Sequence, residues 1–197
     1  MNALPASPTS RARCVKCALP LRTCVCALVA RVGNRVDVLV LQHPGEEREA
    51  KGSARLMALS LARCRVVVGE AFEPAVLRTL LQPGSVLLYP AETNAAPAAA
   101  DAGTTTQLVV LDGTWRKSLR MLRSNPLLHD LPRWSLAAPP PGRYGALRKA
   151  RRAGQLSTLE ATCAALSALE ADDARYAPLL DAFDRFVADR VARTCRA

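Results

Sequence analysis

Four cysteines near the start of the chain have the spacing of a metal site. Cys14 and Cys17 form a C-x-x-C pair, and Cys24 and Cys26 follow as C-x-C, so four thiols fall within thirteen residues. Four thiolates complete the tetrahedral shell of a structural zinc ion. The alternative is a set of core or redox thiols. The spacing favours zinc, with Cys14, Cys17, Cys24 and Cys26 as its ligands.

A single acid, Asp112, stands where an apolar run gives way to a basic helix, in the sequence LDGTWRKSLRML. A carboxylate at the end of a buried strand is costly unless a partner pairs with it or chemistry uses it. In open α/β sheets, ligands bind beyond the carboxyl ends of the strands. Gly113 permits a tight turn, and Thr114 can cap the next helix, whose free N–H groups face the same crevice. Position alone leaves two interpretations: Asp112 only caps the helix, or it belongs to a ligand site.

The helix after this turn has an apolar face and a basic face. Trp115, Leu119 and Leu122 follow the spacing i, i+4, i+7, so we expect them to pack inward. A neighbouring stripe, free to meet phosphate, consists of Arg116, Arg120 and Arg123.

The elements that must position these residues alternate along the chain. Strands are expected at 35–42, 65–68, 85–89 and 107–111, helices at 53–64, 74–81 and after Trp115, and a short extended segment near 133–136. Ser157 and Glu160 have capping-box spacing and open a helix to about residue 170, and Pro178 suits the first turn of a last helix. The alternation predicts an α/β fold: a mostly parallel sheet with helices on both faces.

Composition limits the class of protein. With 197 residues, half of them apolar, the chain can bury one core. No apolar stretch approaches the length of a membrane span, and the start lacks a secretory signal, so we expect a cytoplasmic protein without membrane contact. In that reducing compartment seven cysteines indicate metal ligands or packing rather than disulfides; Cys64, Cys163 and Cys195 are expected to pack.

The formal net charge of +10 is concentrated in two segments. Residues 1–35 hold six basic residues and no acid, and residues 111–160 hold ten basic residues and three acids. Such patches attract nucleic acid, although solubility charge is the alternative. The loop at 138–155 concentrates charges suited to phosphate beside an aromatic ring able to stack on a base: Arg143, Tyr144, Arg148, Lys149, Arg151 and Arg152.

Two further residues, His43 and Glu46, follow the end of the first expected strand and are near enough in sequence to approach the same crevice. His43 has an alternative role as a loop residue bonded to backbone. The chain has two histidines and no G-x-S-x-G element, which disfavours a Ser/His/Asp hydrolase.

Several segments together resemble the DTW-domain family. LDGTWRKS is similar to the Asp-x-Thr-Trp element of that family, and the likeness continues in the cysteine array, LQHPGEE, SARL, LYPAE, NPLLHDLPR and YGALRKARRAGQLSTLEA. Matched elements in the same order over residues 11–165 are unlikely to arise by accident.

This resemblance implies a tRNA-uridine aminocarboxypropyltransferase with a SPOUT-like fold and a C-terminal trefoil knot. The division implied is a zinc module at 1–35 and a catalytic domain at 36–197. S-adenosylmethionine would be held by Tyr89, Pro90, Leu111, Gly113, Thr114, Trp115, Leu136, Ser157 and Thr158. Besides the basic loop, Arg55, Lys117 and Arg120 would contact tRNA, for which the resemblance favours modification in the variable loop.

Asp112 is then the expected catalytic residue. Uridine N3 carries a proton and is a poor nucleophile until a base accepts it. The sulfonium is already a good leaving group, so zinc would be structural. Two alternatives remain: a SPOUT-like methyltransferase using the same donor, or a non-catalytic, zinc-stabilised RNA-binding protein. The sequence does not decide between a monomer and a homodimer.

Overall fold

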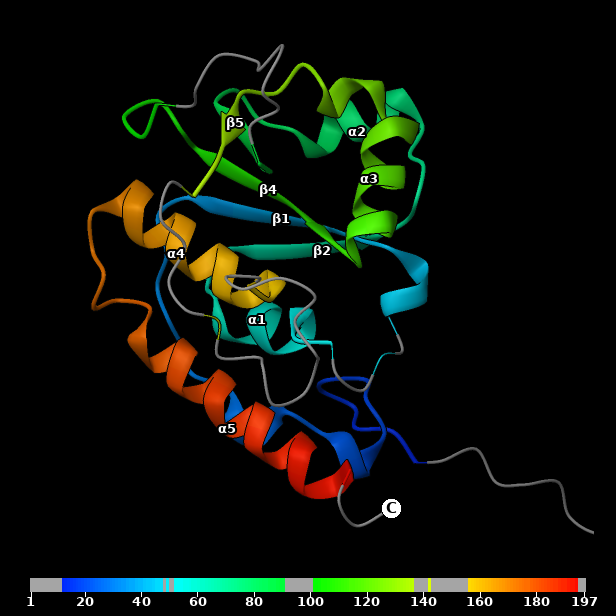
Figure 1. Ribbon diagram of the computed structural model, residues 1–197, viewed down its shortest axis with the longest axis vertical. Coiled ribbons are helices and arrows are strands. Elements are labelled where there is room, and N and C mark those ends of the chain that lie inside the picture. The colour runs from blue at the N-terminus through cyan, green and yellow to red at the C-terminus, as the bar shows by residue number, and fades with distance from the viewer. Residues whose placement is uncertain are drawn as a thin grey trace, which may run out of the picture.

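Five parallel strands form the centre of the part of the chain that the structure describes. The computed structural model describes residues 12–47, 49, 52–90, 101–136, 142 and 156–194. Across the sheet the order is β2 (Cys64–Val68), β1 (Asp37–Gln42), β4 (Gln107–Asp112), β3 (Ser85–Leu88) and β5 (Arg133–Trp134) (Figure 1). Each neighbouring pair is parallel, as the sequence predicted.

Helices cover both faces of this sheet (Figure 1). On one face lie α1 (Ala54–Ser60) and α4 (Thr158–Glu170), with α5 (Ala177–Thr194) packed against both; on the other lie α2 (Pro74–Leu80) and α3 (Trp115–Ser124). Alternate residues of β1 serve the two cores: Val38 and Val40 join the cluster on the α1 and α4 side, while Leu39 and Leu41 join the cluster on the α2 and α3 side.

Tertiary pairing changes two of the predicted boundaries. The helix expected over 53–64 ends at Ser60, because residues 60–62 pair with Val32: the Val32 N–H donates to the Ser60 carbonyl and the Ala62 N–H to that of Val32. The chain then enters β2 at Cys64. The strand expected to stop at 111 continues to Asp112, which pairs in register with Gln42. The predicted capping box is confirmed at the start of α4.

Residues 12–35 pack onto the helical layer formed by α1 and α5. They contain the 3₁₀ helices η1 (Leu21–Thr23) and η2 (Cys26–Leu28), and two more, η3 (Pro44–Glu46) and η4 (Pro126–Leu128), follow β1 and α3. Cys17, Val25 and Val32 belong to the same buried cluster as Phe183 of α5. No helix in the described ranges is long and apolar enough to cross a membrane.

A buried acid, Glu170, fixes the end of α4 to the start of β1. Its Oε1 accepts hydrogen bonds from the backbone N–H groups of Arg35 (2.6 Å) and Val36 (2.9 Å), and its Oε2 accepts one from Arg175 (2.9 Å). The side chain is 1% exposed. One carboxylate therefore joins segments 134 residues apart.

Replacing this acid should lower the free energy of unfolding. Glu170→Ala leaves the two backbone donors without their acceptor and removes one of the two acids that pair with Arg175, and we expect a loss of about 3 kcal/mol. Urea denaturation followed by circular dichroism measures it. The matched control, Asp173→Ala, removes an exposed acid nearby and should change stability by less than about 0.5 kcal/mol. Equal effects of the two substitutions would contradict a special role for Glu170.

Candidate active site

Asp112 ends the central strand β4 with both of its carboxylate oxygens held. Thr158 Oγ1 donates to Oδ1 at 2.6 Å, and Gln42 Nε2 donates to Oδ2 at 2.8 Å. Asp112 is 8% exposed. Gln42 is placed by its register opposite Asp112 on β1, and Thr158 by the capping box that starts α4. A buried carboxylate is thus stabilised by two uncharged donors from two other elements.

Asp112 is not the residue that caps α3. The α3 N-cap is Thr114, whose side chain accepts from the Lys117 N–H at 3.4 Å, so the interpretation of Asp112 as the cap is wrong. Gly113 allows a close approach to α3: a Cβ there would lie 3.0 Å from Cβ of Lys117, a tight contact.

Beside Asp112 lies a cavity of about 400 Å³, which we call the aromatic cavity. It lies at the carboxyl ends of β3, β4 and β5, closed by the starts of α3 and α4. Seven of the nine residues expected to hold the donor line it: Tyr89, Pro90, Leu111, Trp115, Leu136, Ser157 and Thr158. Gly113 and Thr114 form the adjoining turn without lining it.

Sequence reasoning missed other residues of the aromatic cavity's wall: Leu88, Val110, Ser118, Trp134, Ser135, Leu156 and Ala161. Trp134 is the one with a usable signal, because an aromatic residue in a short strand beside a predicted ligand loop suits a cavity wall. Since β5 has two residues, the sequence pattern gave no register for it. Among the described residues that line it, the Tyr89 phenol is the only ionisable group, so this part of the lining suits an uncharged ring.

Trp115 stands at the rim of this cavity and is not a core residue. It is 55% exposed and meets Tyr89 edge to face, with ring centroids 6.1 Å apart. The prediction that Trp115 packs inward is therefore wrong. The buried face of α3 is instead formed by Ser118, Met121 and Leu122.

Ion pairs connect the loops around the site to α3. Lys117 Nζ contacts Glu46 Oε1 at 2.7 Å. His43 Nε2 lies 2.7 Å from Glu70 Oε2, and its Nδ1 accepts from the Gly45 N–H, so His43 has the loop role that the sequence left open. Desolvation alone would raise the pKa of Glu70, but the hydrogen bond from His43 and the charge of Arg120 lower it below its ordinary value. Lys117 and Arg120, expected to meet RNA, thus have acidic neighbours.

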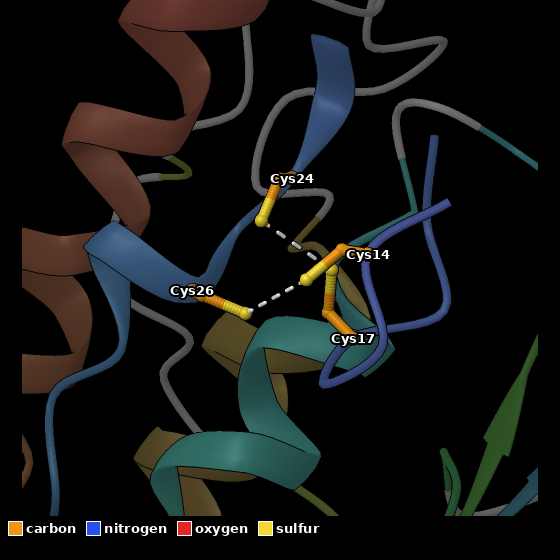
Figure 2. A group of neighbouring side chains, drawn as sticks. All are labelled: Cys14, Cys17, Cys24 and Cys26. Atoms are coloured by element: carbon orange, nitrogen blue, oxygen red, sulfur yellow. Dashed lines mark hydrogen bonds between the residues drawn. The ribbon is translucent and has the colours of Figure 1, made fainter. Parts of the chain in front are cut away.

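The four cysteines converge as a metal shell requires (Figure 2). Their sulfur atoms all lie within 4.8 Å of one another, with Cys14 and Cys26 at 3.7 Å and Cys17 and Cys24 at 3.6 Å. Zinc–sulfur bonds of about 2.3 Å in a tetrahedron put the sulfurs about 3.8 Å apart, which these distances match. The backbone N–H groups of Cys17 and Lys16 lower the pKa of Cys14 to about 6, favouring the thiolate. The cluster is suited to hold a metal ion.

The other described cysteines differ from this cluster. Desolvation raises the pKa of Cys64 to about 12, which keeps it a neutral thiol. Cys163 is buried in the core on the α4 side. Both are packing residues, as expected, while Cys195 lies outside the described residues.

Arg55 connects the cysteine cluster to α1. Its Nε donates to the Cys17 carbonyl at 2.6 Å. Other residues expected to contact RNA lie outside the described residues: Arg143, Tyr144, Arg148, Lys149, Arg151 and Arg152.

Comparison with known proteins identifies the family of this chain. Residues 11–191 match the family described as the DTW domain. The chain belongs to the DTW domain family. A similar protein is tRNA-uridine aminocarboxypropyltransferase 2 of Drosophila melanogaster, 33% identical over 174 residues, which cover 83% of this chain and 68% of the relative. No solved structure matches the chain.

Proposed function

We propose that this DTW-family chain is a tRNA-uridine aminocarboxypropyltransferase. The observation that carries the proposal is a buried carboxylate, held by two hydrogen bonds, beside a cavity with a largely apolar lining in a chain one-third identical to a protein of that name. The donor would be S-adenosylmethionine, with its adenosine in the aromatic cavity. Tyr89 and Trp115 offer ring faces and edges to the base, and Ser157 offers a hydroxyl.

In the proposed reaction Asp112 acts as the base. Its carboxylate accepts the proton of uridine N3 as N3 forms a bond to the propyl carbon attached to sulfur. The sulfur–carbon bond breaks, its electrons neutralise the sulfonium, and methylthioadenosine leaves. Gln42 and Thr158 keep the carboxylate in one orientation, so little rearrangement is needed at the moment of transfer.

The proposal also covers the metal ion, the chain topology and the position of the uridine in the tRNA. The metal held by Cys14, Cys17, Cys24 and Cys26 is proposed to be a structural zinc ion, in a module of residues 1–35 beside a catalytic domain at 36–197. A SPOUT-like trefoil knot is proposed from the family resemblance; residues 137–141 and 143–155, between β5 and α4, lie outside the described ones. The tRNA uridine is proposed to lie in the variable loop.

Incubation with unmodified tRNA and S-adenosylmethionine tests the function and the base together. Mass spectrometry of the digested tRNA should detect aminocarboxypropyluridine; methyluridine in its place would indicate a methyltransferase, and neither product a non-catalytic RNA-binding protein. Asp112→Asn should lower turnover by about 10²- to 10⁴-fold with donor affinity retained, because the amide cannot accept the proton. Asp130→Asn, at an exposed acid, is the matched control. Near-wild-type turnover of Asp112→Asn would exclude the base.

Metal analysis tests the cysteine cluster. Protein purified without chelator should contain about one zinc ion per chain, and Cys26→Ser should reduce the zinc content and the melting temperature, because a hydroxyl replaces one thiolate ligand. The control, Cys64→Ser, changes a cysteine outside the cluster and should retain the metal. Wild-type protein without metal would remove the zinc proposal.

Salt-dependent binding tests the basic loop. Reversing Arg151 and Arg152 to Glu should weaken tRNA binding and reduce the slope of log affinity against log salt by about two, since two phosphate contacts are lost. The control carries the same charge change at Arg78 and Arg185, which are exposed on α2 and α5. If the loop variant binds tRNA as tightly as wild type at low salt, those arginines do not contact phosphate.

A further inference from the structure

A second cavity, of about 300 Å³, opens beside Gln42, the residue that donates to Asp112 Oδ2. We call it the charged cavity. It lies between the ends of β1 and β2, the start of α1 and the cysteine cluster, and its walls include Gln42, Val68, Arg55 and the loop at Cys17. Its volume is at the lower end of the range for small-molecule sites, roughly 300–1,000 Å³.

The hydrogen bonds of Asp112 join the two cavities. Oδ1 is bound by Thr158, which lines the aromatic cavity, and Oδ2 by Gln42, which lines the charged cavity. Gln42 and Asp112 are opposite each other in register. Each lies two residues after a valine, Val40 or Val110, that packs in the core on the α1 and α4 side, so both side chains point to that face of the sheet. The carboxylate therefore has one hydrogen-bond partner in the lining of each cavity.

We propose that the charged cavity receives the target uridine, turned out of the tRNA. This inference rests on the proposed function and names the acceptor site. Displacement at carbon requires the nucleophile to approach opposite the leaving sulfur. With S-adenosylmethionine in the aromatic cavity and the uridine in the charged cavity, N3 would approach the propyl carbon from the side opposite sulfur. Asp112 would accept the N3 proton there.

Gln42 gives this site a means to select uracil. Its amide donates one hydrogen to Asp112, and no second hydrogen bond of the side chain occurs within the described residues, which leaves one N–H and a carbonyl oxygen at the cavity. Uracil presents N3–H beside a carbonyl, so N3–H can donate to Asp112 while the carbonyl accepts from Gln42. Cytosine N3 has no proton to donate. Reading of an unstacked base through this edge is usual for RNA.

The charges of the wall also suit a nucleoside better than a phosphate. Arg55 and Arg13 are present, but so are Glu46, Glu47 and Glu49. A site for phosphate would place cations without facing carboxylates. Carboxylates can instead accept hydrogen bonds from ribose hydroxyls, and such groups distinguish RNA from DNA.

Filling the charged cavity tests the inference. Val68→Phe adds bulk at a wall residue that is 41% exposed; the matched control, Val76→Phe, makes the same change at a residue that is 50% exposed on α2, on the opposite face. We expect kcat/KM for tRNA to fall at least about tenfold in Val68→Phe, with the Kd for S-adenosylmethionine by calorimetry within about twofold of wild type. Val76→Phe should match wild type. A folded Val68→Phe variant with unchanged kcat/KM would overturn the proposal.

A second readout does not depend on catalysis. Unmodified tRNA transcribed with 4-thiouridine in place of uridine is irradiated with the full-length protein in saturating S-adenosylhomocysteine, and cross-linked peptides are identified by mass spectrometry. We expect cross-links to residues 13–19 or 42–68, lost in Val68→Phe and kept in Val76→Phe. The acceptor site would be refuted if all cross-links fell outside these residues. It would also be refuted if cross-links to these residues formed only when S-adenosylhomocysteine was omitted. Failure of the proposed function would instead appear as absence of modified uridine with these cross-links present.

Discussion

The site depends on two hydrogen bonds to one carboxylate. Asp112 is almost fully buried, and a buried carboxylate without partners would destabilise the fold. Gln42 and Thr158 offset that cost with two uncharged hydrogen-bond donors and no cation. A salt bridge at this position would have satisfied the carboxylate too, but it would also have competed with the proton that the proposed reaction delivers.

The sheet and the cap of α4 supply these two donors by separate routes. Parallel pairing between β1 and β4 puts Gln42 opposite Asp112. The capping box of Ser157 and Glu160 fixes where α4 starts and thereby where Thr158 points. Both routes are local rules of secondary structure, yet their products meet at one side chain. A shift of one residue in the β1 register would turn Gln42 to the other face of the sheet and empty one half of the arrangement.

Features set by local signals could be predicted from the sequence, whereas features set by long-range contacts could not. The α/β class with a parallel sheet, the start of α4 and the convergence of four cysteines followed from periodicity, capping and spacing, because each signal is local. The end of α1 was mispredicted, since pairing of residues 60–62 with Val32 overrides a continuous helical pattern. Trp115 was placed inward by its spacing, but it is largely exposed and lines the aromatic cavity against Tyr89, a contact between distant residues that helical spacing does not encode. The partners of Asp112 and the charged cavity depend on contacts across 46 and 70 residues, which no short pattern encodes.

Glu170 adds a consequence for the order of folding. Its carboxylate anchors the far end of α4 to residues just before β1, while the near end of that helix carries Thr158. Strands β1 and β4 can pair before α4 has left the ribosome, but Asp112 then has only one of its two donors. Asp112 therefore gains its second hydrogen bond only after about four-fifths of the chain has been made, so the site is completed late in synthesis.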